Sequence, residues 1–311
     1  MLMRAGLDIF SPGGKNARLS ILIFHRVLPV ADPIFPEEMH AQRFDQVCAW
    51  LRRWFNVLPM DVAVERFRNN TLPKRACCIS FDDGYADNLE VAAPILKKHQ
   101  LSATFFIATG YLGGGRMWND TVIESIRSCS LEAINFPKIG DFEINTAAQR
   151  RRAIDTIIGK VKYLTPEQRL TATEEIAAIA GVQAPDSLMM TADQVRAMRD
   201  LGMQIGAHTS MHPILSKISL QQAEQEICAG RDYLQDLLGS RVGLFAYPNG
   251  KPGEDYGPEH AALVRELGFD AAVSTAWGAA DLHSDVYQLP RFTPWDQSKF
   301  RFGARLLRNL M

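Results

Sequence analysis

The sequence contains no long apolar run and no excess of charge of one sign. Apolar runs such as residues 19–24 are far shorter than the roughly 20 residues of a membrane-spanning helix, and residues 1–10 lack the unbroken apolar core of a signal peptide. The 34 Lys and Arg residues are balanced by 35 Asp and Glu residues, so a nucleic-acid partner is not expected. We therefore predict a cytoplasmic protein without a transmembrane segment, with peripheral attachment to the inner membrane face as an alternative.

Cysteine is scarce, and its arrangement argues against a disulfide framework. The five cysteines are odd in number and include no C-x-x-C pair. Cys77 and Cys78 are adjacent in an apolar run, where neighbouring strand residues point to opposite faces. Reduced thiols, as in a cytoplasmic protein, are the simplest interpretation.

Short apolar runs alternate with helical patterns along the chain. Strands are expected at residues 19–24, 56–58, 76–81, 103–107, 203–207, 243–247 and 270–274, and helices at 87–99, 192–201, 220–238 and 259–267. Ser219 and Gln222 are placed as a capping box at the start of the third of these helices. Continuous apolar strands separated by helices favour a parallel α/β sheet, and about seven such units suit a barrel better than an open sheet.

Residues 117–190 interrupt this alternation. Amphipathic patterns predict helices near residues 146–164 and 166–180, and no strand is expected between residues 117 and 190. We predict one domain over residues 1–311, with its barrel core at about 19–295 and a helical insertion at about 117–190. The insertion is interpreted either as a lid or as an extra packing layer.

Polar groups follow four of the predicted strands. They are His25, Asp82 with Asp83, His208, and Asn249. Because the carboxyl ends of barrel strands meet on one face, these groups are expected to converge. A hairpin turn at Asp83-Gly84 is the alternative, but a helical pattern follows it.

Two adjacent carboxylates and two histidines four residues apart suggest a metal site. One carboxylate with His208 and His212 would give a divalent ion three ligands and leave coordination positions open, as hydrolytic sites require. The second carboxylate would then be free to act as a base. Alone, the histidines would more often be structural, and their combination with the carboxylates favours a metal-dependent hydrolase.

Three motifs resemble those of the polysaccharide deacetylase family (NodB homology, carbohydrate esterase family 4). They are Ser-Phe-Asp-Asp-Gly at residues 80–84, His-Thr-Ser-Met-His-Pro at 208–213 and Phe-Ala-Tyr-Pro-Asn-Gly at 245–250. Their order and spacing are similar to the family's over roughly residues 19–295. The resemblance implies a distorted, NodB-like (β/α)7 barrel and metal-dependent removal of N- or O-acetyl groups from sugars.

The resemblance also implies roles for individual residues. Asp83, His208 and His212 would bind the metal, with zinc as the default ion and iron, cobalt or nickel as alternatives. Asp82 would be the general base. The backbone N–H near Asn249 would stabilise the oxyanion.

The sequence departs from the family pattern at two places. Ala246 occupies the position of an arginine that usually tunes the base, so Arg291 is the candidate to replace it. The usual C-terminal Leu-x-His motif is not convincing. His25 resembles the histidine that an early strand supplies in one branch of the family, and it is our candidate general acid, with His283 as the weaker rival.

Two aromatic residues are further substrate candidates. Tyr247 is expected either to line the acyl pocket or to pack in the barrel. Trp118 is expected to pack in the core, with stacking on a sugar as the alternative. The predicted substrate is an acetylated glycan or a lipid-linked or soluble precursor. The alternatives are hydrolysis of a non-sugar amide C–N bond and an inactive barrel that only binds glycan.

Overall fold

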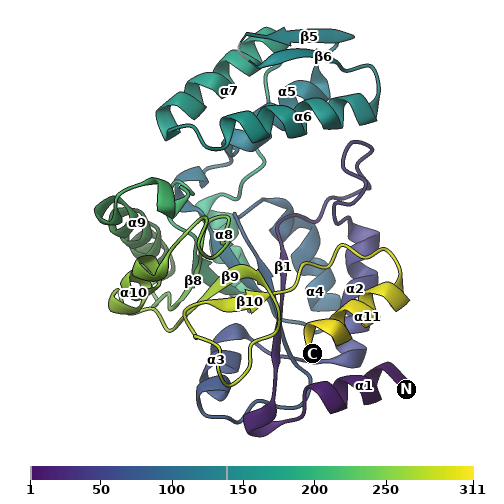
Figure 1. Cartoon of the computed structure of the whole chain (residues 1–311), viewed down its shortest axis with the longest axis vertical. Helices are drawn as coiled ribbons and strands as arrows, with labels where there is room; N and C mark the ends of the chain where they lie inside the picture. Colours follow the sequence, from purple (N-terminus) through teal and green to yellow (C-terminus); the bar gives the residue numbers. More distant parts are fainter. Residues whose placement is uncertain (1, 138) are drawn as a thin grey trace.

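The computed structural model of the chain describes residues 2–137 and 139–311, and it is built on a parallel sheet nearly closed into a barrel (Figure 1). In spatial order the strands are β1 (Leu19–Phe24), β3 (Ala76–Phe81), β4 (Thr104–Ile107), β7 (Gln204–Ala207), β8 (Leu244–Ala246), β9 (Ala271–Trp277) and β10 (Leu289–Arg291), and β2 (Asn56–Val57) pairs with β3. Beyond β10, Phe292 returns to β1 and exchanges backbone hydrogen bonds with Ile21 and Ile23. The predicted distorted (β/α)7 barrel is confirmed.

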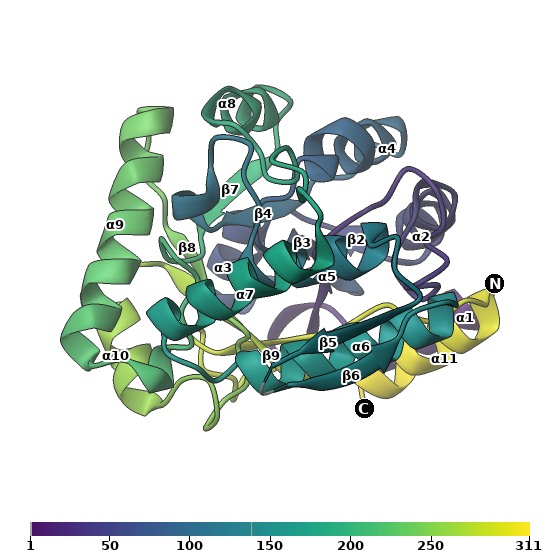
Figure 2. The same ribbon diagram turned by 90° about the horizontal axis from the view of Figure 1, so that it is seen from above.

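Helices pack around the outside of the sheet (Figures 1 and 2). They are α1 (Leu2–Phe10), α2 (Ala41–Trp54), α3 (Met60–Arg68), a π-helix (Asn88–Ala92) continuing into α4 (Ala93–Lys98), α8 (Ala192–Asp200), α9 (Leu220–Leu238), α10 (Pro258–Glu266) and α11 (Lys299–Asn309). The predicted capping box is present, since the Ser219 hydroxyl accepts a hydrogen bond from the Gln222 backbone N–H. Every residue of β1 and β3 is buried, which explains their continuous apolar runs.

The insertion forms a separate layer at one end of the barrel (Figure 1). Its elements are α5 (Trp118–Ser128), β5 (Ala133–Phe136), β6 (Gly140–Glu143), α6 (Ala147–Val161) and α7 (Pro166–Ala180). It has its own apolar cluster, in which Val122, Ile154 and Ile176 are buried. The two predicted helices are present, but the expectation that the insertion contains no strand was wrong.

The missed strands form a small antiparallel hairpin, with Ala133 opposite Glu143 and Phe136 opposite Gly140. Each strand has only four residues, and only Ile134 and Phe136 are buried in them. So short an alternation leaves little periodic signal in the sequence.

Two predictions about the whole chain concern membranes and thiols. Across residues 2–137 and 139–311, no helix combines the length and apolar composition needed to cross a bilayer. All five cysteines are free, and Cys77 and Cys78 are fully buried in β3. Burial raises the pKa of both thiols, so they remain protonated and act as packing groups.

Candidate active site

The polar groups that follow the strands converge on a cleft of about 270 Å³ beneath the insertion. Its lining includes His25, Asp82, Asp83, His208, His212 and Asn249. These residues come from four loops, after β1, β3, β7 and β8. The convergence expected from a parallel barrel is therefore observed.

Asp83, His208 and His212 form a compact group of potential metal ligands. The Asp83 Oδ1 atom lies 3.5 Å from His208 Nε2 and 3.4 Å from His212 Nε2. One ligand atom from each residue lies within 4.8 Å of the others. Two imidazole nitrogens and one carboxylate oxygen suit zinc and other divalent transition metals, so the donor set fits such an ion.

A second shell of contacts orients these ligands. The His208 Nδ1 atom donates a hydrogen bond to the Ala246 carbonyl at 2.7 Å, which leaves Nε2 available as a ligand. Burial lowers the pKa of His212 to about 4, so its imidazole is neutral at pH 7, the form that binds metals. Burial opposes ionisation of Asp83, but its close contacts with His208 and His212 hold its pKa well below the usual value.

The backbone is strained where it presents these groups. Four non-glycine residues around the cleft have positive φ: Asp83 at 76°, Thr209 at 63°, His212 at 51° and Asn249 at 57°. L-residues rarely adopt this conformation, and such strain concentrates at functional sites. Each of these residues lies in a loop after a strand, and Asp83, His212 and Asn249 line the cleft.

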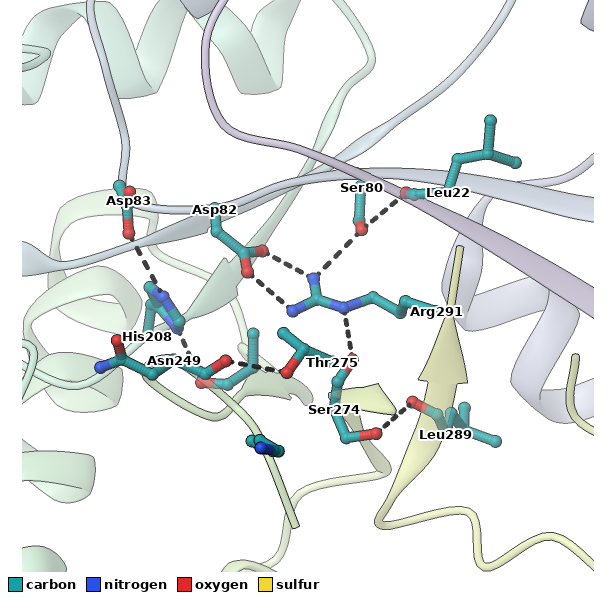
Figure 3. Close-up of polar contacts among 12 residues, drawn as sticks. Leu22, Ser80, Asp82, Asp83, His208, Asn249, Ser274, Thr275, Leu289 and Arg291 are labelled. Carbon is teal, nitrogen blue, oxygen red and sulfur yellow. Dashed lines mark hydrogen bonds and ion pairs between the residues drawn. The ribbon is translucent and has the colours of Figure 1, made fainter. Parts of the chain in front are cut away.

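Asp82 is held by Arg291 in a buried ion pair with two parallel hydrogen bonds. Both N···O distances are 2.7 Å, and the two residues are 2% and 1% exposed (Figure 3). Arg291 also donates to the Ser274 carbonyl and to the Ser80 hydroxyl. Burial opposes ionisation of Asp82, but Arg291 and then His208 lower its pKa below the usual value. Arg291 is thus the arginine that pairs with Asp82, as the sequence suggested when it showed alanine at position 246.

His25 lines the cleft, whereas His283 lies at the other end of the barrel. The His25 carbonyl accepts a hydrogen bond from Asn88 Nδ2 at 2.9 Å, which anchors the loop after β1. His283 belongs to a turn just after Ala280, which pairs with Leu19 at the start of β1. The six residues of β1 separate the two ends by roughly 20 Å.

Asn249 lines the cleft from the loop after β8. Its carbonyl accepts a hydrogen bond from Thr275 Oγ1 at 2.9 Å, which ties the loop after β8 to β9 (Figure 3). Within the described parts of the chain, no hydrogen bond is donated by the Asn249 backbone N–H. This arrangement leaves a donor for an oxygen atom in the cleft.

The two aromatic candidates occupy different surroundings. Tyr247 is fully buried, its ring stacks on Tyr256 at 3.8 Å, and its hydroxyl donates to the Tyr287 carbonyl, so it packs in the barrel. Trp118, at the start of α5, is half-buried and lines the cleft. The expectation that Trp118 packs in the core was wrong, because the insertion places it above the site rather than inside the barrel.

Sequence reasoning missed two cations that line the cleft. Lys162 and Arg169 come from the insertion, at the end of α6 and in the first turns of α7. In the sequence they look like ordinary polar residues of amphipathic helices. Only the position of the insertion over the barrel brings them to the site.

A nearly closed parallel barrel with carboxylates and histidines at its strand ends has the architecture of a barrel hydrolase. The chain belongs to the polysaccharide deacetylase family, because the family model described as polysaccharide deacetylase matches residues 69–136 and 143–272. This membership makes it a carbohydrate deacetylase, in a family whose members use a divalent metal.

Individual relatives agree with this assignment. The chain is 21% identical over 279 residues to the putative polysaccharide deacetylase YxkH of Bacillus subtilis, covering 89% of this chain and 71% of that protein. Two solved structures share the fold. The deacetylase PplD of Streptococcus pyogenes, in complex with acetate, has a TM-score of 0.63 at 20% identity and covers 95% and 99% of the two chains. IcaB from Ammonifex degensii has a TM-score of 0.60 at 17% identity and covers 96% and 98%.

Proposed function

We propose that the protein is a divalent-metal-dependent hydrolase that removes N-acetyl, or O-acetyl, groups from a glycan or a glycan precursor. The observation that carries this proposal is the Asp83, His208 and His212 cluster beside the buried Asp82–Arg291 pair. Such an arrangement provides a metal site and, next to it, a separate ionised carboxylate. Zinc is the default ion, with iron, cobalt or nickel as alternatives.

In this proposal Asp82 is the general base. A bound divalent ion supplies Lewis-acid chemistry, increasing the acidity of water and polarising the acyl carbonyl. Asp82 accepts a proton from the water that attacks the acyl carbon. Arg291 keeps Asp82 ionised and fixed, since both carboxylate oxygens are bound to its guanidinium group.

The remaining steps use groups on the other loops. The Asn249 backbone N–H stabilises the negative charge that develops on the acyl oxygen. The C–N bond then breaks, the acyl group leaves as acetate, and the departing amine needs a proton. We assign this proton donation to His25, and its position in the cleft lining, on the loop after β1, supports the assignment.

The decisive experiment combines metal analysis of the purified protein with acetate-release assays. Acetylated saccharides should release acetate in a metal-dependent way, and small non-sugar amides should release little. The reverse preference would support the amide hydrolase alternative, and no turnover with metal bound would support the inactive barrel. The Arg291–Asp82 pair supports the active enzyme over the inactive barrel, because it supplies Asp82 with an arginine although position 246 is alanine. The cytoplasmic location is still a prediction, and cell fractionation would test it.

The proton donor has its own test in a pair of histidine variants. His25→Gln should keep the metal but lower kcat about 100-fold, because general acid catalysis contributes roughly this much. His283→Gln should leave kcat unchanged, since His283 lies at the opposite end of the barrel. Acetate release and metal content are measured in parallel for both variants. Loss of activity in His283→Gln alone would overturn the assignment.

A further inference from the structure

A second cavity, of about 800 Å³, shares lining residues with the active-site cleft. Its lining residues come mainly from α5 and α7 of the insertion and from α9 of the barrel. Trp118 and Arg169 line both cavities, so they stand at the junction between them. A cavity of this volume is typical of sites for drug-sized ligands, which indicates a substrate that extends beyond the reacting sugar.

Arg169 is unusual among the buried arginines. Arg75, Arg169 and Arg291 are all buried, and Arg75 and Arg291 form ion pairs with Asp8 and Asp82. Arg169 is only 8% exposed, yet no carboxylate of the described residues pairs with it. Its only side-chain hydrogen bond in the described residues is a long one, 3.4 Å, to the Lys162 carbonyl. Burial lowers its pKa, which reflects the cost of a desolvated cation without a counter-charge.

Trp118 fixes the position of this guanidinium group. The Arg169 Cζ atom lies 4.9 Å from the centroid of the Trp118 ring, a cation–π contact. Such a contact holds the planar group in place without occupying its N–H donors. The donors therefore remain available at the junction of the two cavities.

The neighbouring charges do not neutralise Arg169. Lys162, which also lines the cleft, adds a second cation that forms no ion pair within the described residues. In the larger cavity Arg116 is paired with Asp186, and Glu226 accepts hydrogen bonds from the backbone N–H groups of Ser210 and Met211. Glu167 also lines that cavity but is exposed to solvent. Among the described residues, neither Arg169 nor Lys162 thus has an ion-pair partner.

We propose that Arg169, with Lys162 beside it, binds an anionic group of the substrate, a phosphate or a carboxylate carried next to the acetylated sugar. This inference rests on the proposed function, and it narrows the substrate to an acidic acetylated saccharide. Guanidinium groups bind phosphate and carboxylate oxygens through parallel N–H bonds, and ligand binding would supply the missing counter-charge. Trp118, between the two cavities, packs against the sugar.

Binding of three probes to the metal-free, EDTA-treated protein tests this site without interference from the metal. The probes are N-acetylglucosamine, N-acetylglucosamine 1-phosphate and N-acetylmuramic acid, measured by isothermal titration calorimetry. One charged probe should bind at least about 10-fold more tightly than the neutral sugar, because hydrogen bonds to charged groups contribute about this much. The probe that is preferred distinguishes phosphate from carboxylate. Equal affinities for all three would overturn the inference.

Substitutions test which residues cause the preference for the charged probe. Arg169→Gln should remove the advantage of the charged probe, Arg169→Lys should retain part of it, and Lys162→Gln should reduce it. Arg152→Gln is the matched control, because Arg152 is an exposed arginine of α6 outside both cavities. A preference that survives in a folded Arg169→Gln variant contradicts the proposal. If Arg169→Gln does not fold, the Arg169→Lys and Lys162→Gln results decide.

The outcome separates this inference from the proposed function. Acetate release from neutral saccharides, without preference for charged ones in binding, would leave the deacetylase intact and remove the anion site. A charge preference that depends on Arg169, with no acetate release from any saccharide, would leave the anion site and remove the deacetylase.

Discussion

The cleft has a barrel wall, formed by the loops after the strands, and an insertion wall, formed by the insertion. The two walls differ in whether their charged groups are paired. On the barrel wall, Asp82 is paired with Arg291, and Asp83 lies against two histidines. On the insertion wall, Lys162 and Arg169 have no carboxylate partner within the described chain. Internal pairing fixes the geometry of reacting groups before substrate arrives, whereas unpaired charge is available to a ligand. In our proposal the barrel wall carries out the reaction, and the insertion wall recognises the substrate.

Removing a metal ligand should have the largest effect on the barrel wall. Asp83→Ala removes the carboxylate that both histidines face, so the bound metal and acetate release should fall to background together. Metal content by mass spectrometry and acetate release are measured on the same sample. Asp236→Ala, an exposed carboxylate on α9, is the control and should change neither. A variant that keeps both metal and activity would contradict the ligand assignment.

Removing the base should separate catalysis from metal binding. Asp82→Asn keeps the shape of the side chain but cannot accept a proton, so kcat should fall about 10²- to 10⁴-fold. Metal content should be unchanged, because Asp82 is not part of the ligand cluster. Both kcat and metal content are measured on the variant. Full activity would exclude Asp82 as the base.

Breaking the ion pair from the arginine side should affect stability as well as activity. Arg291→Gln leaves Asp82 as a buried carboxylate without its counter-charge, which should lower the free energy of unfolding by about 3–5 kcal/mol. The pKa of Asp82 should rise, so the acid limb of the pH–activity profile should move to higher pH. Urea denaturation and the pH profile measure the two effects.

An exposed arginine pair provides the control for this effect. Arg241→Gln breaks the ion pair with Asp270, in which both side chains are more than 40% exposed, and should cost less than about 1 kcal/mol. Equal losses of stability in the two variants would mean that burial does not strengthen the dependence of Asp82 on Arg291.

The difference between the two walls also explains what the sequence could predict. Most barrel strands were predicted because they are short, largely apolar runs, and their polar ends converge by topology alone. Strand β10 was missed, since it has three residues and contains Pro290. Arg291 was still a candidate, because Ala246 occupies the position of the family's usual arginine and another arginine was needed beside the base. The position of Lys162 and Arg169 in the cleft could not be predicted. It depends on how the insertion packs over the barrel, and the local sequence pattern does not determine that packing.

The smallest effect is expected on the insertion wall, at Trp118. Trp118→Ala removes the ring that contacts Arg169 and lines both cavities, so KM for an acetylated saccharide should rise about 5- to 10-fold, as expected for roughly 1 kcal/mol of contact energy. The value of kcat should change little, because Trp118 touches none of the proposed reacting groups. Trp118→Phe keeps an aromatic face and should recover part of the affinity. If Trp118→Ala instead lowered kcat as far as His25→Gln does, at unchanged KM, both walls would be part of the reaction and the distinction between them would be lost.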